Sequence, residues 1–400
     1  MPEVEFTNLL IVAVIALIAP LTLGFAPSVR VPAVVLEILA GVVVGPHGLG
    51  WVEIDLPIQI VSLIGLAFLL FLAGLEVDVH QLRGPLLRLA IVGFIVTLVL
   101  GMLVGLGLHA ADWVMSPTLI AVTLAATSLG LVVPVLKDAG QIESPLGQST
   151  IAAASIADFG AIVLLSLFFS TSGGSTGSRL VLLIAFAALV AVTALVVSLV
   201  ARSKRLDMTL TRLQDTTAEI RVRAAVVLLI AFVALAEKFG LESILGAFMA
   251  GAVVGILDRD TESHPNFHLK LEAMGYGFLI PVFFVASGMR LDLGGLFGSP
   301  SAIARVPVFV LALLVVRGVP ALLFARTFDR SSVAAAALLQ ATSLPFIVTA
   351  TQIGVLAGLM TPVTAAALIC AGLVSVIVFP TVALSLLRSR AITHSTRAVT

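Results

Sequence analysis

Apolar stretches of about 20 residues recur from one end of the chain to the other, and they limit what it can fold into. A helix of that length crosses the hydrocarbon core of a bilayer. Only 11% of the 400 residues are charged, roughly half the share usual in soluble domains, and the mean hydropathy is +1.20. These features exclude a soluble globular protein and predict an all-α polytopic membrane protein embedded in a lipid bilayer.

Breaks at charged residues and at Gly- or Pro-rich sites divide the chain into thirteen predicted transmembrane helices. Their limits are 7–26, 31–46, 58–77, 86–108, 114–137, 146–170, 179–201, 221–238, 241–257, 274–291, 302–326, 331–354 and 361–388. The first follows Glu3 and Glu5 rather than a basic patch, and its apolar run is too long for a signal-peptide core. We therefore interpret it as a retained helix.

The distribution of basic residues predicts the orientation, because Lys and Arg favour the cytoplasmic side. With the N-terminus outside, the cytoplasmic loops and tail hold 17 of the 22 basic residues, the outer side holds four, and Arg317 lies within a span. The 17 are Arg30, Arg83, Arg88, Lys137, Arg202, Lys204, Arg205, Arg212, Arg221, Arg223, Arg259, Lys270, Arg326, Arg330, Arg388, Arg390 and Arg397. The outer four are Arg179, Lys238, Arg290 and Arg305. An odd number of spans then places the C-terminus in the cytoplasm.

Three short motifs occur twice, in the same order and at nearly constant offset. They lie at 40–45 and 250–255, at 74–78 and 288–292, and at 126–129 and 341–344, which gives offsets of 210, 214 and 215. Each pair is seven helices apart, an odd number, so the two copies cross the membrane in opposite directions. The sequence therefore predicts two inverted five-helix repeats, about 31–170 and about 241–388, with linker helices at about 179–238 between them.

The repeated motifs have two interpretations. Small-residue motifs such as Ala-Gly-x-Val-Val-Gly commonly serve only to pack helices closely. That interpretation suits 40–45 and 250–255, but it does not explain the polar pairs Thr127-Ser128 and Thr342-Ser343 deep in spans 5 and 12.

Both polar pairs lie beside a proline, which indicates broken helices. Pro134 and Pro345 each remove a backbone donor and free the carbonyl four residues earlier, at Gly130 and Ala341. Non-helical backbone at that depth survives only where it is buried in protein or lines a cavity. Freed carbonyls, hydroxyls and half-helix ends together suit a small cation. Simple kinks, with the hydroxyls bonded to their own helices, are the alternative.

Asp158 stands near the middle of span 6, with no other charge between Glu143 and Arg179. An aspartate at the bilayer centre costs roughly 2.5–3.5 kcal/mol on insertion scales. A buried carboxylate is neutralised by a proton, a cation or a basic partner. Asp158 is therefore the predicted cation- and proton-binding residue, with Ser155, Thr127 and Ser128 as companion ligands.

Arg317 in span 11 is the only charge between Arg305 and Arg326. Arginine stays protonated, so it must face the protein interior near acceptors. It could compensate the carbonyl ends of broken helices, or it could pair with Asp158. A tight permanent pair would oppose proton loading, whereas a looser arrangement would leave the aspartate free to cycle.

The remaining candidates carry less weight. Glu37 in span 2 could sit in a cytoplasmic funnel or at a subunit contact, and Glu76 lies at a helix end, where snorkelling explains it. Cys370 is the only cysteine and the six histidines are scattered, so no cluster of metal ligands is predicted. The only metal ion expected is the monovalent cation at Asp158. The net charge of zero gives no reason to expect nucleic-acid binding.

Four motifs in order carry a resemblance to a known family. The segments 31–46 (VPAVVLEILAGVVVGP), 71–78 (FLAGLEVD), 246–251 (GAFMAG) and 281–292 (PVFFVASGMRLD) resemble the bacterial monovalent cation:proton antiporter-2 family over nearly the whole chain. The resemblance implies a single sodium/hydrogen exchanger domain over 1–400 with the sodium/proton antiporter fold. Its mobile core would comprise spans 4–6 and 11–13, with spans 5 and 12 broken and crossing each other. It also implies a homodimer in the bacterial inner membrane, no cofactor, Asp158 as the exchange carboxylate and Arg317 in the place of the core basic residue.

The chain departs from the family pattern at one position. Electrogenic members carry two adjacent acids in span 6 and electroneutral relatives carry Asn-Asp, whereas this chain has Ala157-Asp158. One carboxylate that cycles between a proton and a monovalent cation moves one charge in each direction, so we predict electroneutral exchange. A cation channel, an efflux subunit of the potassium-efflux type and a sodium-coupled symporter are the alternatives, and no cytoplasmic regulatory domain is expected within the chain.

Overall fold

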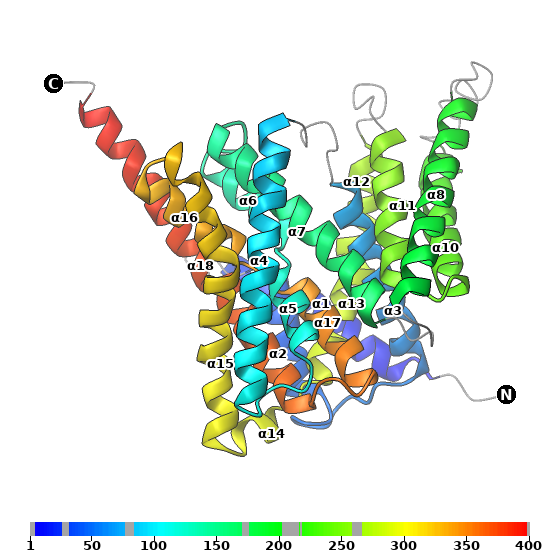
Figure 1. Cartoon of the computed structure of the whole chain (residues 1–400). Coiled ribbons are helices and arrows are strands. Elements are labelled where there is room, and N and C mark those ends of the chain that lie inside the picture. The colour runs from blue at the N-terminus through cyan, green and yellow to red at the C-terminus, as the bar shows by residue number, and fades with distance from the viewer. Residues whose placement is uncertain are drawn as a thin grey trace. The chain divides into compact units, whose positions relative to one another are not determined.

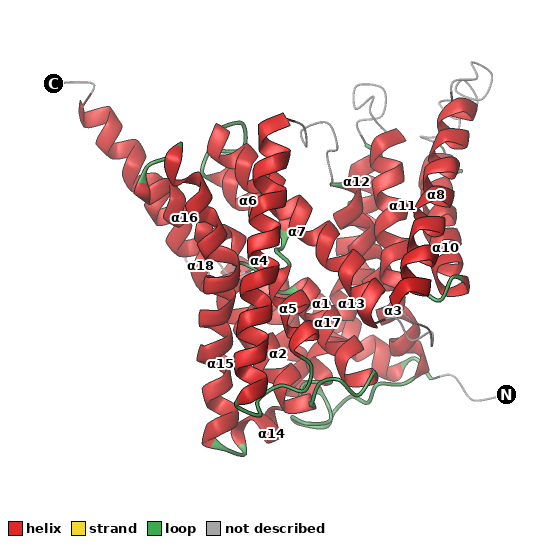
Figure 2. Cartoon of the chain, viewed as in Figure 1, coloured by secondary structure: helices red, strands yellow, loops and turns green. Residues whose placement is uncertain are grey.

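A computed structural model of the chain describes residues 5–25, 32–76, 84–169, 176–201, 216, 218–257 and 266–397. Every regular element in these ranges is a helix (Figures 1 and 2), which confirms the predicted all-α class. The predicted linker segment 202–215, Asp78, and the basic residues Arg30, Arg83 and Arg259 lie outside the described residues.

The chain divides into two compact units, each assembled from segments that are distant in sequence. Unit 1 comprises Met1–Ala16, Ile54–Val79 and Ile162–Ala286, and unit 2 comprises Leu17–Glu53, His80–Ala161 and Ser287–Thr400. Unit 2 therefore contains most of the six spans that the family resemblance assigns to the core.

Each of the thirteen predicted spans contains helix. Unit 1 contains α3 (Leu56–Leu75), α8 (Thr176–Ala201), α10 (Ile220–Lys238), α11 (Ser243–Leu257), α12 (Phe267–Met274) and the π-helical turn η1 (Gly275–Leu279). Unit 2 contains α2 (Ala33–Val44), α4 (Gly84–Ala110), α5 (Pro117–Ala125), α6 (Leu129–Asp138), α14 (Leu293–Phe297), α15 (Pro300–Leu313), the π-helical turn η2 (Leu314–Gly318), the 3₁₀ segment η3 (Val319–Arg326), α16 (Arg330–Gln340), α17 (Pro345–Leu356) and α18 (Pro362–Arg397). Helices α1 (Thr7–Phe25), α7 (Pro145–Phe169) and α13 (Ile280–Met289) begin in one unit and end in the other.

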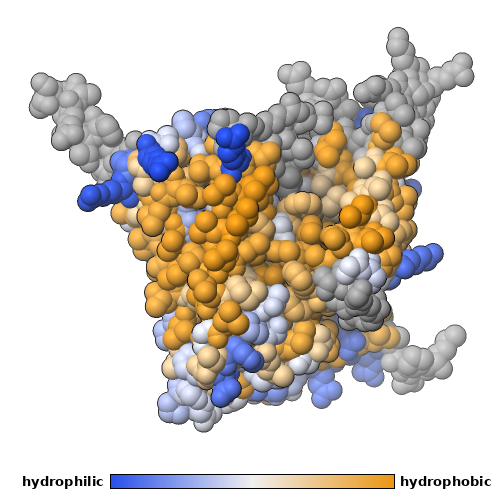
Figure 3. Space-filling view, in the orientation of Figure 1, coloured by the Kyte–Doolittle hydropathy of each residue, from blue (hydrophilic) through white to orange (hydrophobic). Residues whose placement is uncertain are grey.

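The helices have the length and composition of membrane spans. Among the described residues, seven are long and apolar enough to cross a bilayer, and five shorter apolar helices accompany them. Helix α4 shows what such a helix exposes: Ile91, Ile95, Val99, Leu103 and Leu106 form one exposed stripe at helical spacing. Figure 3 shows apolar side chains over the middle of α4 and α15 and hydrophilic ones toward their ends. The protein is a multi-pass membrane protein; thirteen crossings remain its predicted number.

The two halves of the sequence repeat one close helix contact. In unit 1, a Cβ on Gly74 of α3 would lie 2.1 Å from the carbonyl oxygen of Phe248 in α11. In unit 2, a Cβ on Gly288 of α13 would lie 2.0 Å from the carbonyl oxygen of Ile38 in α2. Gly74 and Gly288 are 214 residues apart and Ile38 and Phe248 are 210 apart, the offsets of the sequence motifs. The small-residue motifs therefore pack helices closely, and the matching contacts support an internal repeat.

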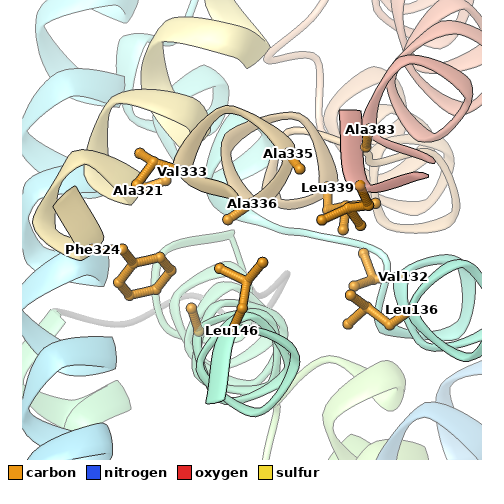
Figure 4. Packing of buried hydrophobic residues seen from close by; sticks show 12 residues of the cluster. Val132, Leu136, Leu146, Ala321, Phe324, Val333, Ala335, Ala336, Leu339 and Ala383 are labelled. Carbon is orange, nitrogen blue, oxygen red and sulfur yellow. The ribbon is translucent and has the colours of Figure 1, made fainter. Parts of the chain in front are cut away.

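A hydrophobic cluster fixes the helix ends that surround the site in unit 2. Val132 and Leu136 of α6 pack with Leu146 of α7 and with Phe324 of η3 and Leu339 of α16 (Figure 4). These side chains are at most 4% exposed. The cluster thus joins the half-helices α6 and α16. A helix as short as α6, with about six backbone hydrogen bonds, is marginal by itself, so side-chain packing in this cluster stabilises it.

Two of the predicted spans are interrupted, as the sequence indicates. Residues 126–128 separate α5 from α6, and residues 341–344 separate α16 from α17. The second break precedes Pro345, the first residue of α17, where a missing N–H removes no helical bond. The first break lies earlier than Gly130, the expected position, and Pro134 is the sixth residue of α6. Pro134 therefore does not determine where α5 ends. Polar side chains that bond to the backbone of residues 127–129 do so.

Candidate ion-binding site

The two helix breaks meet inside unit 2. The backbone N–H of Ser128 donates to the carbonyl of Thr342 over 2.9 Å, and the hydroxyl of Thr127 donates to the carbonyl of Gln340 over 2.7 Å. These four residues are at most 8% exposed. The opened backbone is therefore satisfied by the other break and by buried side chains, which is the condition for non-helical chain at membrane depth.

Asp158 of α7 is bound by the N-terminal end of α6. Its Oδ1 accepts from the backbone N–H of Thr127 over 3.0 Å, and its Oδ2 accepts from the N–H of Leu129 over 3.2 Å. The Ser128 side chain makes no capping bond at this end, so the carboxylate supplies the cap from another helix. Free N–H groups and the positive end of a half-helix favour a negative charge at this position.

Asp158 is only half-buried, although its neighbours Ala157 and Ser155 are buried. Ser155 lies three residues before it on α7, and residues at that spacing share a helix face. A partly accessible carboxylate with two fixed amide donors has lone pairs left over for a proton or a metal ion.

Arg317 lies in the π-helical turn η2 and is 1% exposed. Its Nε donates to Thr127 Oγ1 over 2.8 Å and to the Gln340 carbonyl over 3.3 Å. Its Nη1 donates to Thr97 Oγ1 of α4 over 3.2 Å, and its Nη2 also donates to Thr127 Oγ1. Every acceptor is neutral, and Gln340 is the last residue of α16, where a positive charge complements the helix dipole.

Arg317 and Asp158 are thus separate partners of Thr127. Among the residues that the structure describes, Arg317 makes no direct ion pair with Asp158. The amide of Thr127 binds the carboxylate, and its hydroxyl binds the guanidinium. The sequence allows Arg317 either to pair with Asp158 or to compensate the carbonyl end of a broken helix. Its bond to the Gln340 carbonyl at the end of α16 matches the second role.

The second break adds further hydroxyls. Thr342 Oγ1 donates to the carbonyl of Leu338 over 3.1 Å. Ser375 Oγ of α18 accepts from the N–H of Ser343 over 3.2 Å and donates to the Ser343 carbonyl over 3.1 Å. Within the described residues, Ser343 Oγ and Gln340 Nε2 are buried without a hydrogen-bond partner.

Other predicted residues lie apart from these bonds. Glu37 is buried at 5% exposure in α2, and Glu76 is exposed at the end of α3 in unit 1. Among the residues that the structure describes, no hydrogen bond joins Glu37 to the polar groups above.

The sequence analysis did not identify three residues that contact the site. Thr97, Gln340 and Ser375 all bond to the breaks or to Arg317. A signal does exist for Thr97, which is the only hydroxyl residue between Arg88 and His109. Its partner, however, is 220 residues away in sequence.

Comparison with known proteins agrees with this architecture. A chain of apolar helices with two interrupted spans and a half-buried intramembrane carboxylate has the architecture of a membrane transporter. Residues 13–388 match the family described as "Sodium/hydrogen exchanger, transmembrane", and the chain belongs to that family. The family resemblance of the sequence motifs is thereby confirmed.

Individual relatives are antiporters by name. The chain is 32% identical over 371 residues to "Putative Na(+)/H(+) antiporter YjbQ" of Bacillus subtilis (strain 168), which covers 88% of this chain and 58% of the relative. It thus spans little more than half of that relative's length. It is 30% identical over 293 residues to "Na(+)/H(+) antiporter" of Enterococcus hirae, covering 72% of this chain and 74% of that protein.

A solved structure shares the fold. The sodium proton antiporter MjNhaP1 from Methanocaldococcus jannaschii, solved at pH 8, superposes with a TM-score of 0.69, covering 96% of this chain and 99% of the other at 20% identity. At that identity the likeness concerns the fold alone.

Proposed function

We propose that this chain is a secondary active antiporter that exchanges a monovalent cation, Na⁺ or K⁺, for a proton by alternating access. The observation that carries the proposal is the state of Asp158. This half-buried carboxylate lies where the two breaks meet and bonds to two backbone amides rather than to a basic side chain. A proton and a cation can therefore replace one another on it.

The transported cation would take its remaining ligands from oxygens close to Asp158. Ser155 and Ser128 supply hydroxyls, and the breaks at 126–128 and 341–344, with Thr342 and Ser343, supply further oxygens. The hydroxyl of Thr127 donates once and accepts twice from Arg317, so it is fully used. We therefore assign Thr127 to holding Asp158 and Arg317 rather than to binding the cation through its side chain.

The relatives support antiport over the alternatives. YjbQ and the Enterococcus hirae protein carry antiporter names. "Glutathione-regulated potassium-efflux system protein KefC" of Klebsiella pneumoniae is 29% identical over 74% of this chain and only 47% of itself. Sodium and potassium both remain candidate ions, because the relatives include "Na(+)/H(+)-K(+) antiporter GerN" of Bacillus cereus.

The deciding experiment is a pH-gradient dequenching assay in proteoliposomes, with Na⁺, K⁺ and Li⁺ added in turn. Antiport gives proton movement that depends on the cation gradient and saturates with cation concentration. Cation flux without proton movement indicates a channel. Proton movement that needs an added organic solute indicates a symporter. Either of the last two results overturns the proposal.

Exchange through a single carboxylate is expected to be electroneutral. One positive charge moves in each direction per cycle, because Ala157 leaves Asp158 without an acidic neighbour on α7. A membrane potential of 100 mV is worth about 2.3 kcal/mol for each net charge moved. The transport rate should therefore stay the same when a diffusion potential of either sign, set up with a permeant ion that the protein does not transport, is imposed during Na⁺/H⁺ exchange. A rate that rises with one sign and falls with the other would contradict a one-to-one stoichiometry.

We also propose a homodimer in the bacterial inner membrane, with the N-terminus outside and the C-terminus in the cytoplasm. The sorting of the 22 basic residues supports this orientation. Labelling of single cysteines introduced at Glu53 and Lys137, in a background without Cys370, tests it: an impermeant reagent should label the first and not the second in intact cells.

A further inference from the structure

Arg317 carries a permanent positive charge at a fully buried position, yet within the described residues it makes no direct ion pair with an acid. Ala157, the residue before Asp158, is 0% exposed and carries only a methyl group. Removing an arginine from water costs several kcal/mol unless acceptors replace the lost hydration. The acceptors that Arg317 finds must therefore explain how it stays in place.

All three guanidinium nitrogens are bonded, and all to neutral oxygens. Thr127 Oγ1 receives two of these bonds, the Gln340 carbonyl receives one, and Thr97 Oγ1 receives one. Thr127 and Gln340 belong to the helix breaks. Thr97 belongs to the long helix α4 and, among the described residues, is the only hydrogen-bond partner of Nη1.

The position of Thr97 favours this contact. It is 0% exposed, it is the one hydroxyl in the interior of an otherwise apolar helix, and α4 packs against η2 and α5. Without its oxygen, Nη1 would be a buried charged donor with no acceptor, which costs more than a neutral donor does. The strongest acceptor close to the shared partner Thr127 is the carboxylate of Asp158.

We propose that Thr97 and Thr127 form a hydroxyl clamp that holds Arg317 away from Asp158, so that the exchange carboxylate stays free of a permanent ion pair. Thr97 is then a positioning residue that acts through Arg317. This inference rests on the proposed exchange at Asp158, and it adds the residues that keep Arg317 from pairing with that carboxylate. Neutral oxygens keep the guanidinium in place, and no second carboxylate competes for the cation.

The other charged groups on the surrounding elements do not compete for this role. Helices α5 and α17 carry none, and Asp158 is the only one on α7. Arg88 and His109 are nine and twelve residues from Thr97 on α4, or ~13 and ~18 Å along the helix axis. Glu37, a buried carboxylate, lies on α2. Arg305 lies within α15, twelve residues before Arg317, and donates to Thr364 Oγ1 over 2.7 Å. The others lie at helix ends: Lys137 and Asp138 on α6, Arg326 on η3 and Arg330 on α16.

The test is Thr97→Val, which removes the oxygen and keeps the shape, compared with wild type in the proteoliposome exchange assay. If the guanidinium turns to Asp158, it competes with both the cation and the proton. We expect the KM for the cation to rise about tenfold, the effect of one lost bond to a charged group. Exchange activity falls at low pH, where Asp158 stays protonated and cannot bind the cation. In Thr97→Val this fall should occur about one pH unit lower, because a closer positive charge makes Asp158 bind protons less readily.

Two variants make the result specific. Thr97→Ser keeps the hydroxyl and should restore both the KM and the pH profile. Thr123→Val removes an equally buried hydroxyl that bonds only within α5, to the carbonyl of Leu119, and should leave both unchanged. If Thr97→Val does not fold, Thr97→Cys replaces it, because sulfur is a weak acceptor of similar size.

The outcomes separate this inference from the proposed function. Absence of exchange in the wild type refutes the function and the clamp together. Exchange in the wild type with an unshifted KM and pH profile in Thr97→Val refutes the clamp alone. A lower maximal rate without either shift would mean that Thr97 is merely structural, and it also refutes the clamp.

Discussion

Asp158→Asn should abolish cation-driven proton movement, lowering the exchange rate by on the order of 100-fold or more, the least that losing a proton-transferring side chain usually costs. Asparagine has nearly the same shape, and its oxygen can still accept the N–H of Thr127. It cannot take up a proton, and it does not neutralise a bound cation. The measurement is the initial rate of dequenching when Na⁺ or K⁺ is added to liposomes that carry a pH gradient.

A matched control distinguishes loss of the site from loss of a negative charge. Glu143→Gln removes an exposed carboxylate just before the start of the same helix α7, and its exchange rate should equal that of the wild type. The amount of folded protein should be similar in both variants. If Asp158→Asn retains proton-coupled exchange, Asp158 is not the exchange carboxylate. If it retains cation flux without proton coupling, the channel alternative gains support.

The architecture could be predicted because each helix that crosses a bilayer needs a run of about 20 mainly apolar residues. Length and apolarity predicted thirteen spans that each contain helix, although α14 and most of α12 lie outside them, and the repeated motifs predicted which positions in the two halves are equivalent. The pairs Gly74 with Phe248 and Gly288 with Ile38 lie at those same offsets. Both features follow from local composition or from internal comparison, so no knowledge of distant contacts was needed.

The polar bonds of the site could be predicted only in part. Asp158, Arg317 and the Thr-Ser pairs are conspicuous because polar residues are rare in this sequence. The connections between them are not, because they join residues 190 and 220 positions apart, as in Arg317 with Thr127 and with Thr97. The position of the first break also depended on such bonds, since the amides of Thr127 and Leu129 are satisfied by Asp158 rather than by helix α5.

The second large effect concerns the close contact between α3 and α11. Gly251→Val should destabilise the protein by at least about 1–3 kcal/mol, the usual cost of overpacking, and strongly reduce the folded yield. A Cβ at Gly251 would lie 1.9 Å from the carbonyl oxygen of Phe71 and 2.9 Å from the backbone N of Leu75. Backbone atoms cannot rotate away as a side chain can, so the helices would have to separate. Thermal unfolding in detergent, followed by loss of the monodisperse protein, measures the effect.

The control for this prediction is Gly107→Val, the same substitution in helix α4. No atom lies within 4 Å of a Cβ at Gly107, so this variant changes helix propensity and apolar surface without forcing helices apart. Gly288→Val should resemble Gly251→Val, because its Cβ would lie 2.0 Å from the carbonyl of Ile38. Equal stability of Gly251→Val and Gly107→Val would contradict the α3–α11 contact. A large loss in both Gly251→Val and Gly288→Val would mean that both halves of the sequence depend on the same packing, as an internal repeat requires.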